Sequence, residues 1–123
     1  MIRSISFCKE FIPLIKSGKK TVTRRIKFTG NPGDIYWFKI GRTGKKEGYI
    51  KIKEVTLSQL KQINIPYRGE DESEEYEREG FYNPMSYMLN FIKLWNKLNP
   101  KGYKWRDNPM VYRIEFEYLG EKL

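Results

Sequence analysis

The sequence predicts an α+β domain of about five strands and two main helices. Three observations predict it: apolar and polar residues alternate in several short runs, two other runs carry apolar residues at helical spacing, and turns rich in glycine and proline separate them. Because several strands follow one another, the pattern favours a small closed barrel with the helices packed outside. The 123 residues fit one domain, covering residues 1–123.

The N-terminal part predicts a strand, a short helix and a second strand. Residues 2–7 alternate between apolar and polar side chains, which is typical of a strand. Residues 10–17 place their apolar side chains on one helical face, and Gly18 is a natural residue to end that helix. Residues 21–26 are β-branched and alternating, which predicts the next strand.

The middle of the chain predicts a hairpin. A turn at residues 31–34, Asn-Pro-Gly-Asp, precedes an aromatic-rich strand over residues 35–40. Residues 41–48 then form a hairpin loop, and residues 49–57 form the returning strand.

The C-terminal part predicts a long helix and a last strand. The acidic stretch 69–80 is either a mobile loop or a short surface helix ended by its final glycine. Asn83-Pro84 is typical of a helix start, and this helix runs to about residue 98. Residues 110–119 alternate cleanly as the last strand. The apolar stripe of the helix comprises Met85, Met88, Leu89, Ile92 and Trp95.

Charge is unevenly distributed along the chain. The net charge is +9, and residues 1–53 hold 14 Lys and Arg against three acids, whereas residues 54–90 hold three against eight. Such a polarised chain suits a polyanionic partner such as nucleic acid. The alternatives are a charge that only serves solubility and a basic sheet surface that serves a protein partner.

Residue types that are missing exclude several kinds of chemistry. The sequence has no His, so imidazole catalysis and His-Cys zinc sites are excluded, and we expect no metal and no cofactor. The single Cys8 forms no internal disulfide, which favours a reducing compartment. No apolar run approaches the ~20 residues of a membrane helix, and no signal peptide is evident. We therefore expect a cytoplasmic protein without a membrane partner, and favour a monomer.

The stretch 17–25, "SGKKTVTRR", carries the resemblance to a known family. Its pattern Gly18-x-Lys20-x-x-Thr23-x-Arg25 resembles the signature of the ASCH domain, a branch of the PUA-like β-barrel proteins. The resemblance continues through "PGDIYWFKI", through Glu79-Gly80 before a helix, and through "WRDNPMVYRIEF" at the C-terminus. It spans nearly the whole chain.

The resemblance implies a barrel of five or six mostly antiparallel strands, with two or three helices outside and a cleft lined by the signature. It implies RNA or a nucleoside as the ligand. One branch of similar proteins hydrolyses the amide of N4-acetylcytidine with a Lys, a Thr and a Glu, which match Lys20, Thr23 and Glu79. The sequence departs from that branch in Lys19, Arg24 and a longer acidic segment. Ribonuclease activity, attributed to some ASCH proteins, has no residue pattern that can be tested here.

The residues of the signature also predict a site by their chemistry. In an extended strand, Thr23 and Arg25 share a face, and Lys20 lies at the turn before it. Lys20 is either a base that activates Thr23 or a clamp for phosphate, and Arg25 can bind a phosphate or an oxyanion. The structural alternative is a sheet edge protected by cations. Glu79 either holds a proton for Lys20 or is one more solvated acid of its run.

Further binding candidates lie outside the signature. Aromatic side chains in loops or on the last strand can stack on a base. A basic loop at 42–46 can contact phosphate, but its sequence is equally typical of a solvated hairpin tip. We therefore predict an RNA- or nucleotide-binding domain, with an N4-acetylcytidine-type amidohydrolase as the alternative. The predicted binding residues are Gly18, Lys19, Lys20, Thr23, Arg24, Arg25, Arg42, Tyr82, Trp105 and Tyr112.

Overall fold

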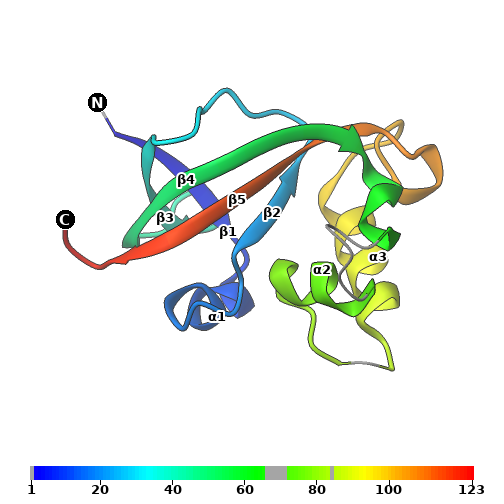
Figure 1. The fold of residues 1–123 in the computed structure, drawn as a ribbon, viewed down its shortest axis with the longest axis horizontal. Coiled ribbons are helices and arrows are strands. Elements are labelled where there is room, and N and C mark those ends of the chain that lie inside the picture. The colour runs from blue at the N-terminus through cyan, green and yellow to red at the C-terminus, as the bar shows by residue number, and fades with distance from the viewer. Residues whose placement is uncertain (1, 66–71, 84) are drawn as a thin grey trace.

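The computed structural model describes residues 2–65, 72–83 and 85–123. Five strands form one sheet, and the helices lie below it and at one end of it (Figure 1), which confirms the α+β class. In chain order the elements are β1 (Arg3–Phe7), η1 (Lys9–Phe11), α1 (Ile12–Lys16), β2 (Val22–Arg25), β3 (Ile35–Ile40), β4 (Lys46–Gln59), η2 (Leu60–Asn64), α2 (Glu72–Glu79), α3 (Tyr87–Leu98), η4 (Trp105–Asp107) and β5 (Met110–Gly120).

The sheet has the strand order β1-β3-β4-β5-β2. Strands β1 and β3 pair in parallel, and the other three pairs are antiparallel, as predicted for most of the sheet. The two long strands β4 and β5 cross the molecule side by side (Figure 1), with register shifts that bend β4 between Tyr49 and Ile50 and between Ile52 and Glu54. This bending lets one sheet wrap around its own core.

The predicted closure into a barrel is not present in the described part of the chain. The edge strands β1 and β2 pair only with β3 and β5, respectively. In a closed barrel, backbone hydrogen bonds would join β1 to β2. Here a side chain joins them instead: Arg25 Nη2 of β2 donates to the main-chain oxygen of Ser6 of β1 over 2.6 Å. A side chain thus joins the two edges without backbone pairing, and leaves room between them.

The predicted helix over 10–17 is a 3-10 turn, η1, followed by α1, which ends at Lys16, and Gly18 follows the C-cap Ser17 as the expected stop. Gly18 has φ +79°, a conformation that glycine adopts without strain. The amides of both Lys19 and Lys20 donate to the oxygen of Leu14, at 2.9 and 3.0 Å. This reversal directs the chain from α1 straight into β2.

The acidic stretch forms the short helix α2, which Gly80 follows as expected, but one side of this helix is buried and not solvated. Glu75, Tyr76 and Glu79 are buried, with exposures of 2, 1 and 4%. Burial is tolerated because cations of β2 and β5 face the carboxylates, as described below. Residues 69–71 of the predicted segment lie outside the described residues.

Helix α3 ends at Leu98 as predicted but begins at Tyr87, and its buried face differs from the predicted stripe. Phe91 and Trp95 are buried, whereas Met85, Met88 and Leu89 are exposed. The buried face of α3 is set by its neighbours, because Tyr76 of α2 packs on Phe91. The predicted helix start included Pro84, which lies outside the described residues.

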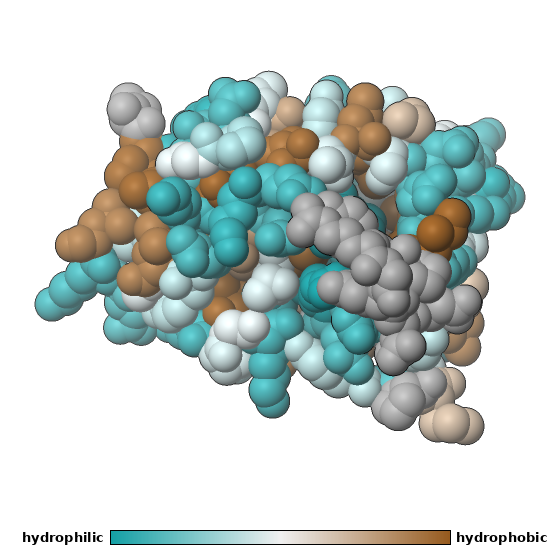
Figure 2. All heavy atoms as spheres, in the orientation of Figure 1, coloured by the Kyte–Doolittle hydropathy of each residue, from teal (hydrophilic) through white to brown (hydrophobic). Residues whose placement is uncertain are grey.

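Two apolar clusters stabilise the fold. One fills the curved sheet and contacts α1, and the other joins α2, α3, η2 and η4 to β5. On the face shown in Figure 2, hydrophilic residues cover much of the middle, and hydrophobic ones gather at the margin where the chain ends lie. In the described part of the chain, no helix is long and apolar enough to cross a membrane.

Candidate functional site

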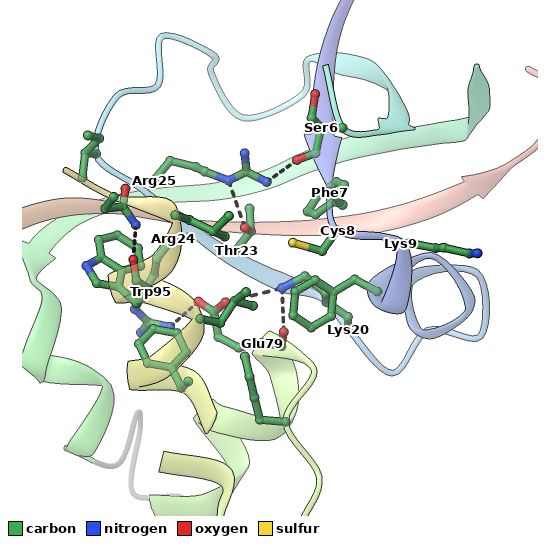
Figure 3. Close-up of a pocket in the computed structure, with 18 of the residues that line it drawn as sticks. Ser6, Phe7, Cys8, Lys9, Lys20, Thr23, Arg24, Arg25, Glu79 and Trp95 are labelled. Carbon is green, nitrogen blue, oxygen red and sulfur yellow. Dashed lines mark hydrogen bonds and ion pairs between the residues drawn. The ribbon is translucent and has the colours of Figure 1, made fainter. Parts of the chain in front are cut away.

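A pocket of about 640 Å³ opens between the edge strands β1 and β2 and the helices α2 and α3. It lies where the strands are joined by a side chain and not by a ladder. Figure 3 shows Lys20, Thr23 and Arg25 converging on it from β2 and the preceding turn, opposite Ser6 and Cys8 at the end of β1. The volume lies in the range of roughly 300–1,000 Å³ that is typical of small-ligand sites.

Lys20 is held in place because the backbone of the next residue, Thr21, is bonded on both sides. The amide of Thr21 donates to the oxygen of Arg78 in α2, and the amide of Phe116 in β5 donates to the oxygen of Thr21, both at 2.9 Å. The turn at Gly18 brings the chain to this position from α1. The Lys20 side chain is therefore directed beneath β2 toward the end of α2, and only 2% of the residue is exposed.

The Lys20 ammonium group has three oxygen partners. Nζ donates to the main-chain oxygens of Val22 and Glu79, at 2.8 and 2.6 Å, and lies 3.4 Å from Glu79 Oε1. Two aromatic rings also lie near Nζ, those of Phe11 and Phe7, with centroids 4.4 and 5.8 Å away. All three donors of the ammonium are thus engaged.

The environment shifts the Lys20 equilibrium toward the neutral amine. Burial is the largest cause and lowers the pKa of Lys20 from 10.5 to about 8, while the Glu79 carboxylate acts in the opposite direction. The charges of Arg25 and Arg24 add to the lowering. Near pH 8 both protonation states of Lys20 are populated, which is the property of a group that can move a proton.

Glu79 is the last residue of α2 and lies beside Lys20, although 59 positions separate them in the sequence. Gly80 ends the helix with φ +104°, and a Cβ at this position would lie 2.8 Å from Phe11 Cε1. A glycine is therefore required for α2 to end this close to η1. Within the predicted acidic run, Glu79 is not a solvated acid but a buried partner of Lys20.

The Arg24 side chain forms ion pairs with two carboxylates inside the protein. Its Nη1 donates to Glu79 Oε2 over 2.8 Å, and its Nη2 lies 3.6 Å from Glu75 Oε1. Glu75 in turn accepts from Arg113 Nε of β5 over 3.0 Å. The chain of contacts from Lys20 through Glu79, Arg24 and Glu75 to Arg113 fixes α2 to the sheet. Arg24, predicted as a binding residue, borders the pocket, but its Nη atoms face these carboxylates and 6% of the residue is exposed.

Thr23 and Arg25 share one face of β2, as predicted from the alternation. Arg25 Nε donates to Thr23 Oγ1 over 3.1 Å, and Nη2 reaches Ser6 across the sheet edges. The guanidinium carbon also lies 5.0 Å from the centroid of the Phe7 ring. Since the Thr23 hydroxyl accepts from Arg25, its own hydrogen can be donated to a ligand.

The walls of the pocket are largely apolar, and they were not predicted from the sequence. Trp95 was expected to be packed inside; it is buried and also borders the pocket. The 3.6-residue spacing of the apolar residues in α3 predicts that one face of the helix is buried, but it does not predict a cavity beside that face. The main aromatic side chains of the walls are Phe7, Phe11, Phe81, Phe91 and Trp95.

Several predicted binding residues lie outside the pocket. Arg42 is exposed in the β3–β4 turn, and Tyr112 packs against the sheet core. Trp105 packs edge-on against Phe91 in the second apolar cluster. Tyr82 is 40% exposed.

Two predicted residues of the turn before β2 also lie outside the pocket lining. Lys19 is exposed, and its Nζ lies 5.9 Å from the centroid of the Tyr82 ring. Gly18 is exposed as well and serves the turn. The structure thus brings Lys20, Thr23, Arg24, Arg25 and Glu79 together at the pocket.

No protein-family model matches this sequence, and no curated protein matches it. Solved structures do resemble the fold. A protein of the DUF984 family from Enterococcus faecalis V583 has a TM-score of 0.67 at 13% identity, over 98% of this chain and 82% of that one. The ASCH domain from Lactobacillus crispatus JV V101 has a TM-score of 0.60 at 15% identity, over 95 and 79%. ASCH from Zymomonas mobilis has a TM-score of 0.54 at 19% identity, over 97 and 67%.

The chain has the ASCH fold. The resemblance first noted in residues 17–25 is thereby confirmed for the architecture, which this protein shares over nearly its whole length with ASCH structures. At such identities the similarity concerns the fold, and the function is argued below from the site itself.

Proposed function

We propose that this protein binds a nucleobase, in RNA or in a free nucleoside or nucleotide, with the base inside the pocket. The observation that carries the proposal is the convergence of Lys20, Thr23 and Glu79 at a pocket of about 640 Å³ with aromatic walls. Few convergent polar groups within a mainly apolar cavity are what a small, flat, polar ligand requires.

The chemistry of the pocket matches that of a base. A base has a flat face, which can lie against Phe7, Phe81 or Trp95, and stacking contributes roughly 1–3 kcal/mol per base. Its edge carries both donors and acceptors. The Thr23 hydroxyl can donate to a ring nitrogen or carbonyl, and the Glu79 carboxylate can accept from an exocyclic amine.

Amide hydrolysis of an N4-acetylated cytosine nucleoside is the second candidate. The observation that favours it is the distance of 3.4 Å between Lys20 Nζ and Glu79 Oε1, together with the lowered pKa of Lys20. In this reaction the neutral Lys20 amine takes the Thr23 proton while Thr23 Oγ adds to the acetyl carbonyl. The proton then passes to the departing cytosine amine, and water releases acetate from Thr23.

Two contacts favour binding over hydrolysis as the first proposal. The Lys20 ammonium donates to Val22 and Glu79, and no hydrogen bond joins Lys20 to Thr23 among the described residues. Thr23 Oγ1 instead accepts from Arg25. For catalysis, a bound ligand has to draw Lys20 away from the Val22 oxygen toward Thr23.

The test compares two threonines. Binding of cytidine and N4-acetylcytidine is measured by titration calorimetry, and release of cytidine from N4-acetylcytidine is followed by chromatography. Thr23→Val should abolish binding or weaken it about tenfold, as expected for a lost hydrogen bond at a buried group. Thr43→Val, on the exposed β3–β4 turn, is the matched control. Equal affinity of both variants and the wild type would overturn the proposal, and turnover that requires Thr23 would establish the second candidate.

A further inference from the structure

Arg25 differs from Lys20 and Arg24, the two buried cations beside it, because it forms no ion pair with a carboxylate among the described residues. Its Nε and Nη2 donate to a hydroxyl, Thr23 Oγ1, and to a main-chain oxygen, that of Ser6. Among the described residues, Nη1 makes no hydrogen bond. Burial of the guanidinium lowers the pKa of Arg25, and the more distant Glu79 carboxylate acts in the opposite direction.

The one carboxylate at the pocket is already shared by two cations. Glu79 Oε1 faces Lys20 at 3.4 Å, and Oε2 accepts from Arg24 over 2.8 Å. Neither oxygen is within ion-pair distance of Arg25. Described charged residues bordering the pocket are Lys9, Lys20, Arg24, Arg25 and Lys27 against Glu79 alone.

The orientation of the Arg25 side chain is fixed before any ligand arrives. Two of its nitrogens are tied to β1 and β2, and the Phe7 ring lies 5.0 Å from its guanidinium carbon. A guanidinium with a free nitrogen and a fixed plane binds phosphate oxygens well, because little side-chain freedom is lost on binding.

We propose that Arg25 makes the pocket selective for a ligand that carries a phosphate group, so that a nucleotide binds in preference to the neutral nucleoside. This inference rests on the proposed function, since it places the base within the pocket and the phosphate at Arg25. Lys20 and Arg24 do not take this role, because the Lys20 ammonium and both Nη atoms of Arg24 face oxygens of the protein. The phosphate belongs either to a free mononucleotide or to an RNA chain.

The experiment compares each of the four ribonucleosides with its 5′-monophosphate by titration calorimetry. We expect at least one monophosphate to bind about tenfold more tightly than its nucleoside, the effect of one charge-assisted contact. Arg25→Gln should remove this preference. Arg42→Gln removes the same charge from the exposed turn outside the pocket and should retain the preference. Circular dichroism shows whether both variants are folded.

The outcomes separate the two proposals. Equal affinity for nucleoside and monophosphate in the wild type overturns the role of Arg25 but leaves the base pocket standing, and this result needs no variant. A preference that survives Arg25→Gln in a folded protein also overturns it. If no nucleoside or nucleotide binds, inorganic phosphate is titrated: phosphate binding lost in Arg25→Gln upholds the anion site without the base pocket, and no binding overturns both.

One further arm identifies the source of the phosphate. A trinucleotide with free hydroxyls at both ends offers only phosphodiesters, whereas a mononucleotide offers a terminal phosphate. Tighter binding of the trinucleotide, lost in Arg25→Gln, assigns the site to RNA. Tighter binding of the mononucleotide assigns it to a free nucleotide.

Discussion

The ammonium nitrogen of Lys20 donates to the main-chain oxygen of Glu79 over 2.6 Å and lies 3.4 Å from one of its carboxylate oxygens. One residue precedes β2 and the other ends α2, so this contact attaches the helix to the sheet at the edge of the pocket. Both residues are buried, with 2 and 4% exposed. The same pair therefore stabilises the fold and defines the polar end of the site.

Replacing Glu79 by Gln should strongly destabilise the protein. The amide keeps the shape but removes the charge that faces Lys20 and Arg24, and leaving buried charges uncompensated costs about 3 kcal/mol or more. Urea denaturation measures the free energy of unfolding. Glu77→Gln on the same helix is the control, because its carboxylate forms no ion pair among the described residues and it should lose little. Equal stability of the two variants would show that the buried contact is unimportant.

The protein should gain stability with rising pH through the titration of Lys20. Its pKa is lowered to about 8 in the folded protein from the ordinary lysine pKa of 10.5, so between these values the unfolded chain binds more protons than the folded one. Stability then rises with pH in this window and levels off above it. The measurement is the difference in unfolding free energy between wild type and Lys20→Met from pH 7 to 10.5. A difference that stays constant would contradict the lowered pKa.

The same pKa separates the two functions of the site. If the Lys20 ammonium only donates hydrogen bonds, ligand affinity is greatest below pH 8 and falls above it. If the neutral amine is the base that activates Thr23, turnover of N4-acetylcytidine rises through pH 8. The groups that face Lys20 and set this midpoint are Glu79, Arg24 and Arg25. Affinity and rate are measured in the same buffers, and flat profiles for both exclude Lys20 from the site.

Gly80→Ala should cost about 1–2 kcal/mol more than Gly102→Ala, because a Cβ adds contact strain to the cost of a positive φ. Both glycines have positive φ, +104° and +93°. The new methyl would lie 2.8 Å from Phe11 Cε1 at position 80, whereas nothing lies within 4 Å at position 102. Thermal unfolding compares the variants. An equal loss in both would mean that α2 can shift away from Phe11 freely.

Ligand binding should change the fluorescence of Trp95 and not that of the other two tryptophans. Trp95 borders the pocket, whereas Trp37 lies on β3 and Trp105 packs in η4, both outside it. Trp95→Phe should therefore remove the signal on titration with a nucleotide. The variants Trp37→Phe and Trp105→Phe serve as controls and should retain it. A signal carried by Trp105 would move the site to the other side of α3.

How far the sequence predicts this protein depends on the range of the interactions. Strands β3 and β5 begin where predicted because alternation is a local property, and Gly18 ends α1 through its own backbone freedom. The burial of α2 could not be predicted from its local sequence. Its charges suggest a solvated face, and only the cations of β2 and β5, far away in the chain, make burial possible.

The site follows the same rule. The spacing of Lys20, Thr23 and Arg25 could be interpreted within one strand, and their convergence at one pocket agrees with it. The separate roles of Arg24 and Arg25, which are neighbours in the sequence, could not be predicted in this way. Opposite faces of β2 direct one toward the acids of α2 and the other toward β1. The aromatic walls could not be predicted, because an apolar residue beside a cavity has the same sequence spacing as one in a core.

The most direct test is an NMR titration of the ¹⁵N-labelled protein with the tightest-binding nucleotide. If the base lies in the pocket, amide shifts concentrate at the end of β1, along β2, around Glu79 and on the face of α3 near Trp95, with saturation at one equivalent. Arg42 and its turn should show no change. Shifts confined to the basic turn at 42–46, with Thr23 and Glu79 unaffected, would contradict a base-binding pocket and identify a purely electrostatic surface instead.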